Sequence, residues 1–210
     1  APLPVRRLWG VGAVTEKKLI AAGYRLISDI QQAPPGALQK LLGNQGPILQ
    51  QLSFGIDTRP IQAQRQIKSI GDESTYETDL TDKKDIEREI AIHSDIVAQR
   101  LRKHQLLART ISLKIRLASF RTLQRSISIE EGTNLQEDID RLARSLLSHL
   151  VLPEGIRLIG VTASNLGPEM SMASLFSEEN DKRSKAAKAM DEIQAKFGKK
   201  ALQKGFWLEK

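Results

Sequence analysis

The fold is decided by residues 109–130, RTISLKIRLASFRTLQRSISIE, which contain two alternating runs separated by a short turn. From Ile111 to Leu117 every second residue is aliphatic and the residues between are polar, which is typical of a strand with one buried face. The run from Thr122 to Glu130 alternates in the same way, so the two runs are predicted to form an antiparallel hairpin. Arg125 falls on the apolar face of the second run, so we expect it either past the core at the strand's end or rotated outward by a bulge.

Strands and helices are also predicted on both sides of the hairpin. A strand is expected over 67–77, with Gly71 marking a bulge or a close approach, and another over 157–166. Apolar residues at steps of three and four predict helices over 82–101 and 134–150, each opening on a capping residue. The resulting order is the ferredoxin-like split β-α-β-β-α-β arrangement, a four-stranded antiparallel sheet with both helices on one face.

The other face of this sheet is expected to stay open and to bind a polyanion. The hairpin would display Lys114 and Arg116 there among Ser and Thr residues, with Arg109, Arg121 and Arg125 near its ends. Hydroxyl groups contact phosphates as readily as lysines do, so this mixture favours nucleic-acid binding. The alternative is a solvated face whose charges discourage aggregation.

The first 55 residues predict a separate all-helical unit around a glycine turn, Gly10–Gly12. Glycines at such a turn let backbone amides converge on an anion at the start of the next helix. With apolar residues around it and Gly23 as a helix stop, the turn is typical of a helix-hairpin-helix that grips DNA phosphates without reading bases. Two helices are expected around the turn, the second short and running from about Leu26 to Gln32, followed by helices over 36–42 and 47–54.

These patterns divide the chain into four parts and give an α+β fold class. The helical unit, 1–55, is followed by an extended linker over 56–66, where Pro60 disfavours helix at the residue before it. The sheet domain covers 67–167, and a tail with a lysine-rich helix covers 168–210.

Composition sets the class of partner and the compartment. The formal charge of +7 and the pI near 9.7 favour a nucleic acid. No apolar run approaches the ~20 residues needed to cross a bilayer, and the N-terminus lacks a signal pattern, so a cytoplasmic location without a membrane partner is expected. With no cysteine there is no disulfide framework, thiolate nucleophile or cysteine-ligated zinc.

Several stretches carry a resemblance to a known family. The run VRRLWGVG at 5–12, followed by TEKKL at 15–19, is similar to the thumb of Y-family DNA polymerases, in particular their bacterial polymerase IV branch. The linker GIDTRPI at 55–61 and the strand KSIGDESTY at 68–76 resemble the start of that family's little finger. The likeness continues in order over about residues 4–166.

The resemblance implies that the chain is the DNA-holding half of an error-prone translesion polymerase, active in DNA repair. In the family, the thumb grips the minor-groove side of the primer–template duplex, and the little finger lies in the major groove on the backbone of both strands. The implied contacts read no base. They come from Gly10, Gly12, Ala13, Thr15 and Lys18 in the thumb, Ser69, Ile70 and Gly71 on the first strand, and Arg116, Arg121, Thr122, Arg125 and Ser126 in the hairpin.

The resemblance also implies an absence of catalytic residues. Y-family polymerases hold two magnesium ions on palm-domain carboxylates, and that palm would lie before Ala1. We therefore expect no catalytic residue, metal ligand or cofactor in this chain, and no activity from it alone. Carboxylates such as Asp79 stand near helix starts and strand ends, where capping and solvation explain them. His93, His104 and His149 fall on predicted helices with no acid or serine at a useful spacing.

The tail contains a degenerate version of the peptide by which family members bind the sliding clamp, Gln-Leu-Ser-Leu-Phe. This chain keeps Ser174, Leu175 and Phe176 but has Met172 and Ala173 in place of the Gln and the first Leu. The expected partners of the monomer are therefore duplex primer–template DNA and the sliding clamp, and the alternative for the peptide is a linker with one apolar pair.

Two other functions stay open. A sheet of this kind could bind single-stranded RNA, but such proteins stack bases on paired strand aromatics, and these strands offer essentially only Tyr76. The chain could instead be a stand-alone, non-catalytic regulator that competes for DNA ends or for the clamp.

Overall fold

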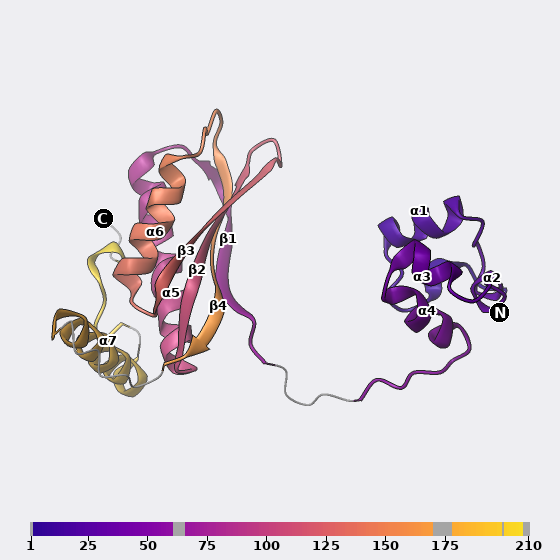
Figure 1. Ribbon diagram of the computed structural model, residues 1–210. Coiled ribbons are helices and arrows are strands. Elements are labelled where there is room, and N and C mark those ends of the chain that lie inside the picture. Colours follow the sequence, from indigo (N-terminus) through magenta and orange to yellow (C-terminus); the bar gives the residue numbers. More distant parts are fainter. Residues whose placement is uncertain (1, 61–65, 170–177, 199, 208–210) are drawn as a thin grey trace. The chain divides into compact units, whose positions relative to one another are not determined.

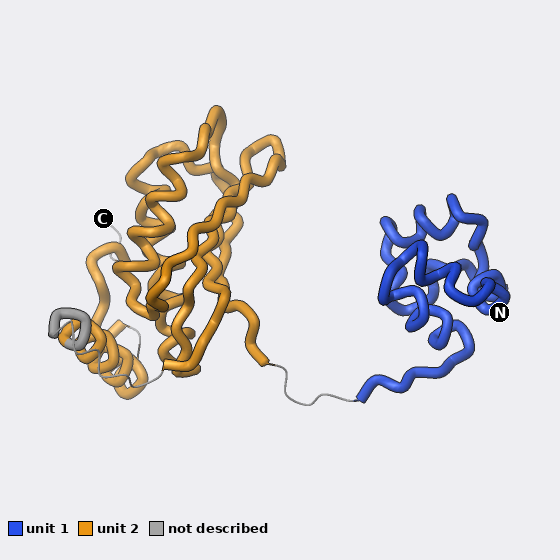
Figure 2. The backbone as a smooth tube through the Cα atoms, viewed as in Figure 1, with its two compact units in different colours: residues 1–65 blue, residues 66–210 orange. Residues whose placement is uncertain are grey.

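The computed structural model describes residues 2–60, 66–169, 178–198 and 200–207. Contacts within the chain divide it into two compact units, residues 1–65 and residues 66–210, which are blue and orange in Figure 2. Each unit encloses its own hydrophobic core. The two units are therefore described separately.

Short helices make up the first unit (Figure 1). They are the 3-10 helix η1 (Val5–Arg7) and the helices α1 (Ala13–Ala21), α2 (Ile27–Gln31), α3 (Ala37–Leu42) and α4 (Gln45–Ser53). Their shared core includes Leu19 and Ile30, neither of which has exposed surface.

The segment before the glycine turn contains only the 3-10 helix η1, whereas the helix predicted from about Leu26 to Gln32 is present as α2. Pro2 and Pro4 limit η1 on its N-terminal side, because they supply no amide donor. On its C-terminal side, Leu8 is extended and Gly10 has a φ of +88°, outside the helical region. Backbone hydrogen bonds from Val5 N to Arg25 O and from Ile27 N to Leu3 O attach this segment to the start of α2.

A four-stranded antiparallel sheet forms the centre of the second unit. Its strands are β1 (Ser69–Leu80), β2 (Leu106–Leu117), β3 (Thr122–Thr133) and β4 (Ile156–Pro168). The helices α5 (Lys83–Lys103) and α6 (Gln136–Ser148) pack together on one face of it (Figure 1). Aliphatic residues such as Ile90, Leu113 and Ile139 fill the space between the sheet and the helices. The predicted α+β class and the β2–β3 hairpin are confirmed.

The predicted ferredoxin-like strand order is wrong. The observed order is β1-β4-β2-β3, which places the second and fourth strands in the centre, where a ferredoxin-like sheet has the first and third. In both arrangements each helix crosses over one strand and all neighbours run antiparallel, so the succession of elements does not distinguish them. The observed order makes β1 and β3 the edge strands.

Local hydrogen bonds account for where the two long helices begin. Asp82 accepts bonds from two amides in the first turn of α5, as predicted. The prediction that α6 opens at Asn134 is wrong, because its N-cap is Leu135, whose amide donates to Thr133 Oγ1. Asn134 is buried instead, and its carbonyl accepts a bond of 2.8 Å from Arg102 of α5.

The C-terminal tail packs on α5. Helix α7 (Glu178–Phe197) is attached through Asp191, which accepts two bonds from Arg102, and the 3-10 helix η2 (Gly205–Trp207) contacts α5. The buried carboxylate of Asp95 accepts a bond of 3.0 Å from the Trp207 indole and pairs with Lys204 at 3.3 Å. Polar contacts therefore fix the tail, whereas the apolar side chain of Phe197 at the end of α7 is 67% exposed.

Candidate nucleic-acid interface

Hydroxyl groups line the open face of the sheet, on the side opposite α5 and α6. This face carries the residues that alternate with the buried aliphatic ones, and the strand register aligns them in rows across the sheet. One row is Ser69, Ser164, Thr110 and Ser128, and the next is Gly71, Thr162, Ser112 and Ser126. Hydroxyls can donate to phosphate oxygens, and such contacts carry no base information.

The third row contains an ion pair that neutralises a predicted DNA-facing lysine. Lys114 of β2 reaches across Gly160 of β4 to Glu73 of β1, with 2.8 Å between Nζ and Oε2. A Cβ on Gly160 would lie 2.8 Å from the Cβ of Glu73, so the glycine leaves room for the carboxylate. In the fourth row Arg116 donates to Thr122 Oγ1 at 3.2 Å. The two basic side chains of this face thus already have partners.

Arg125 lies on the other side of β3. The register is regular through its pairing with Leu113, so no bulge rotates it. It is nevertheless exposed, because β3 is an edge strand and the side chain stands outside the core. The structure therefore separates Arg125 from Arg116 and Ser126, with which the prediction grouped it, while Arg121 occupies the exposed turn before β3.

On β1 the three predicted contact residues differ in what they can offer. Ser69 and Gly71 belong to the open face, whereas the side chain of Ile70 is buried in the core, which leaves its backbone for contact. The register runs unbroken through Gly71, so the bulge alternative is wrong. A Cβ there would lie 2.7 Å from Thr162 Oγ1, which confirms the close approach.

A polar network fixes β1 to α5 behind this face. Asp72 Oδ2 lies 2.8 Å from Nδ1 of the buried His93, and Asp72 Oδ1 pairs with Arg100 at 3.0 Å. Arg100 also donates to the carbonyl of Gly71 at 2.7 Å. Reasoning from the sequence missed this network because it compared His93 only with nearby acids, and Asp72 lies 21 residues earlier on another element.

Tyr76 faces the helices and not the open side of the sheet. Its hydroxyl donates to Glu89 of α5 at 3.0 Å. Burial, followed by the charge of Glu89, raises the pKa of Tyr76, so the hydroxyl stays protonated and remains a donor. In the described strands the open face carries no aromatic side chain on which a base could stack.

The glycine turn of the first unit leaves backbone donors accessible. Gly10 has a φ of +88°, in the left-handed region, and Gly12 is the N-cap of α1 without a side-chain bond to the helix start. The first amides of a helix have no partner within it, so Ala13 and the two residues after it can donate outward. A Cβ added at either glycine meets no atom within 4 Å, and Lys18 is exposed on α1.

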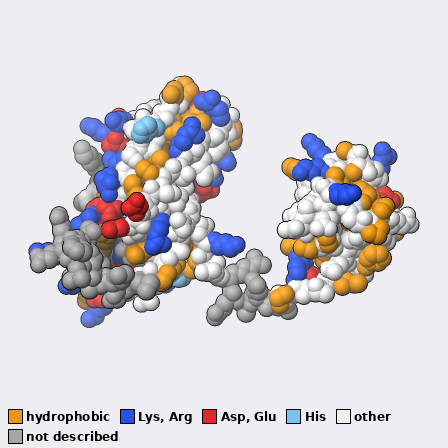
Figure 3. All heavy atoms as spheres, in the orientation of Figure 1, with side chains coloured by type: hydrophobic (Ala, Val, Ile, Leu, Met, Phe, Trp, Pro, Cys, Tyr) orange, Lys and Arg blue, Asp and Glu red, His pale blue; other side chains and the backbone are white. Residues whose placement is uncertain are grey.

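Positive charge is concentrated in the first unit. Residues 1–65 contain eight basic and three acidic side chains, a formal charge of +5, whereas residues 66–210 contain 24 and 22, a charge of +2. Lys and Arg side chains are visible on the surfaces of both units in Figure 3, together with hydrophobic side chains on the first. The two units thus present different chemistry to a polyanion.

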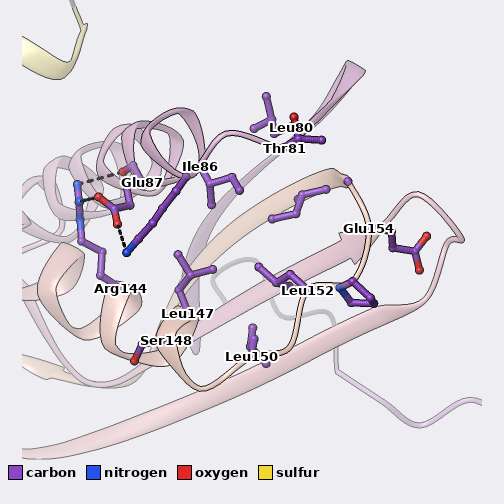
Figure 4. A pocket seen from close by; sticks show the side chains of 14 residues that line it. Leu80, Thr81, Ile86, Glu87, Arg144, Leu147, Ser148, Leu150, Leu152 and Glu154 are labelled. Atoms are coloured by element: carbon purple, nitrogen blue, oxygen red, sulfur yellow. Dashed lines mark hydrogen bonds and ion pairs between the residues drawn. The ribbon is translucent and has the colours of Figure 1, made fainter.

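A cavity of about 680 Å³ lies away from the open face, between the start of α5 and the end of α6 (Figure 4). Leu80, Ile86 and Leu147 contribute apolar walls, and Arg144 pairs there with Glu87 at 2.8 Å. It contains none of the predicted contact residues.

The clamp-peptide residues Ser174, Leu175 and Phe176 lie outside the described residues. Within the described ranges, no three His, Cys, Asp or Glu side chains are grouped so that they could hold a metal ion. No helix in the described part of the chain is both long and apolar enough to span a membrane.

The fold is similar to that of a solved Y-family DNA polymerase chimera, with a TM-score of 0.61 and 21% identity. The likeness covers 78% of this chain and 47% of the chimera's chain. Because the identity is low, this comparison bears on the fold alone.

Sequence comparison establishes the family. Residues 67–175 match the model of the impB/mucB/samB family C-terminal domain, and the chain belongs to this family of Y-family polymerase domains. It is 32% identical over 209 residues to DNA polymerase IV of Brucella melitensis, covering 99% of this chain and 47% of that protein. It is 30% identical over 215 residues to DNA polymerase IV 1 of Bacillus subtilis, covering 100% and 52%. The chain thus spans about half the length of the curated relatives that it matches.

Proposed function

We propose that this chain holds duplex primer–template DNA, without reading its sequence, for an error-prone translesion polymerase of the DNA polymerase IV type. The observation that carries the proposal is the open face of the sheet, where hydroxyl groups stand in aligned rows without a stacking aromatic. Its membership of the Y-family C-terminal domains supports the assignment. In this proposal nucleotidyl transfer belongs to another part of the polymerase.

The second unit, as the little finger, would bind the backbone of both strands. Hydroxyls of the first two rows donate to phosphate oxygens, and Arg116 and Arg121 add charge at the hairpin. Binding of this kind depends on the regular spacing of phosphates and not on base edges, so it tolerates any sequence and any lesion that keeps the backbone in place.

The first unit, as the thumb, would bind a primer phosphate at the glycine turn. The amides at the start of α1 point toward one anion, and the positive end of the helix dipole favours it. Thr15 and Lys18 lie on the same helix and supply a hydroxyl and a charge.

The proposal is tested by titrating the chain into a fluorescently labelled primer–template duplex and following anisotropy at increasing salt. We expect equal affinity for unrelated sequences and a log–log slope of about −0.9 for each phosphate neutralised. A preference for unpaired RNA would favour the RNA-binding alternative. Strong discrimination between sequences, or no binding of duplex at low salt, would overturn the proposal.

We include the sliding clamp as a second partner of the monomer, through Ser174, Leu175 and Phe176. The test is co-sedimentation of the chain with a clamp, comparing the unaltered chain with a Leu175→Ala/Phe176→Ala variant. Equal co-sedimentation of both would remove this part of the proposal and leave DNA binding untouched. A chain that binds the clamp and blocks DNA ends without supporting any polymerase would instead fit the stand-alone regulator.

A further inference from the structure

An exposed indole stands beside the glycine turn of the first unit. Trp9 directly precedes Gly10 and is 69% exposed, although its large apolar ring would gain from burial. The guanidinium of Arg59 lies over this ring, 3.9 Å from its centroid. A cationic group in this position is attracted by the electron-rich face of the indole.

The stack is held in place from the other side by a carboxylate. Arg59 Nε donates to Asp57 Oδ1 at 2.7 Å, and its Nη2 contacts Asp57 Oδ2. Hydrogen bonding to Arg59 lowers the pKa of Asp57 to about 2, so the carboxylate stays charged at neutral pH. The segment after α4 is thereby positioned against the residue before the glycine turn.

A cavity of about 240 Å³ opens next to the stack. Trp9, Arg59 and Thr15 give it polar and aromatic walls, and Ile48, Leu49 and Leu52 of α4 give it aliphatic ones. Its lining therefore combines a cation and a hydroxyl with an apolar floor. A ligand with an apolar ring beside a negative charge would complement this lining.

We propose that Trp9 and Arg59 form a binding site for the sugar–phosphate backbone of one DNA strand, an inference that rests on the proposed function. The deoxyribose ring packs against the indole and the aliphatic side chains of α4, and the neighbouring phosphate accepts from Arg59 Nη1, since Nε and Nη2 are bonded to Asp57. The net charge of +5 on residues 1–65 complements this ligand. Since Arg59 already covers one face of the indole, stacking of a base on that face is excluded.

Trp9 provides its own reporter, because the chain has two tryptophans and the other is Trp207. In a Trp207→Phe background of the full chain, Trp9 emission is recorded while a labelled primer–template duplex is titrated and its anisotropy is followed. We expect the emission change and the anisotropy change to share one midpoint. Trp9→Ala in the unaltered chain should weaken duplex binding about tenfold, because the indole no longer buries apolar surface against the deoxyribose.

Arg59→Ala should weaken binding and reduce the log–log salt slope by up to about 0.9, the value for one phosphate, because Asp57 already offsets part of the Arg59 charge. Lys40→Ala is the matched control, since it removes one exposed positive charge of the same unit outside the cavity. Because Trp9 and Arg59 lie on the surface, their variants should keep the thermal transition of the unaltered chain. If Trp9→Ala lowers the transition, it is replaced by Trp9→Phe, which keeps an apolar ring and should restore part of the affinity.

The outcomes separate this inference from the function on which it rests. If the duplex binds but Trp9 emission does not change, and both variants bind like Lys40→Ala, the sugar–phosphate site is wrong and the proposed function stands. If no duplex binds at low salt, both are wrong.

Discussion

The two units meet the same expected ligand with different chemistry. The first has fewer than half as many residues but more than twice the net charge, and it leaves backbone amides accessible at a glycine turn. The second carries a broad open face on which the one lysine is paired with a glutamate and most other groups are hydroxyls. Charge draws a polyanion to a surface, whereas hydroxyls define a position on its backbone, so the two units should contribute differently to salt dependence.

Truncation of each core should have the largest effect and should stay within its own unit. Leu113→Ala should lower the unfolding free energy of the second unit by about 3 kcal/mol, and Leu19→Ala should do so in the first, because both side chains are fully buried. Urea unfolding is followed by Trp9 emission in a Trp207→Phe background for the first unit, and by Trp207 emission in a Trp9→Phe background for the second. If either variant shifted the unfolding transitions of both units, the two units would not be independently stable.

Removal of the buried carboxylate of Asp95 on α5 should have the second-largest effect on stability. Asp95→Ala takes away the partner of Lys204 and Trp207, so it should lower the stability of the second unit by about 2 kcal/mol and release the tail. Glu192→Ala, an exposed change on α7, serves as the control. Trp207 emission should shift to longer wavelength only in the Asp95 variant, and an unchanged emission would mean that the tail does not depend on Asp95.

Charge and hydroxyl variants should separate the two modes of binding. Lys17→Ala/Lys18→Ala in the first unit should reduce the salt slope by up to about 1.8, the value for two neutralised phosphates. Ser112→Ala/Ser126→Ala on the open face should weaken duplex binding roughly fivefold, about 1 kcal/mol, with the slope unchanged. Ser74→Ala is the control, because Ser74 lies on the helix side of β1, where it pairs with the buried Ile159. If both double variants reduced the salt slope equally, the two units would not differ in their mode of DNA binding.

Releasing Lys114 should have the smallest effect, and in the opposite direction. Glu73→Gln removes the carboxylate that holds Lys114, so duplex affinity should rise a fewfold and the slope should steepen by up to about 0.9. Glu77→Gln changes the same charge on the same strand, without a pairing to Lys114. If Glu73→Gln and Glu77→Gln raise the duplex affinity equally, the ion pair between Glu73 and Lys114 does not limit DNA binding by the second unit.

The two-residue alternation of the strands and the three-to-four-residue spacing of the helices predicted the secondary structure of the second unit well. The alternation from Ile111 to Leu117 determines which face of β2 is buried, and it holds residue by residue. The strand order could not be predicted, because both orders bury the same faces and use the same crossovers. Arg125 could not be placed for a similar reason. The alternating pattern assigns it correctly to the face of β3 that also carries Ile127, but it does not show that β3 is an edge strand, where a side chain on this face can be exposed.

The candidate site was predictable in its elements but not in its partners. The glycine turn and the hydroxyl residues of the hairpin are local features, so the sequence indicates them directly. The pairing of Lys114 with Glu73 joins residues 41 apart through a gap left by Gly160, and the stack of Arg59 on Trp9 joins the two ends of a unit. Such contacts depend on register and packing, which a local pattern does not contain.

The aligned hydroxyl rows have a consequence for motion. Residues on one face of a strand repeat about every 6.8 Å, and the first two rows of the open face offer hydroxyls at neighbouring positions to a passing oxygen atom. A duplex held this way could exchange one contact for an equivalent one at the next position, with little change in energy between steps. The DNA duplex would then advance along these rows while it stays bound to them.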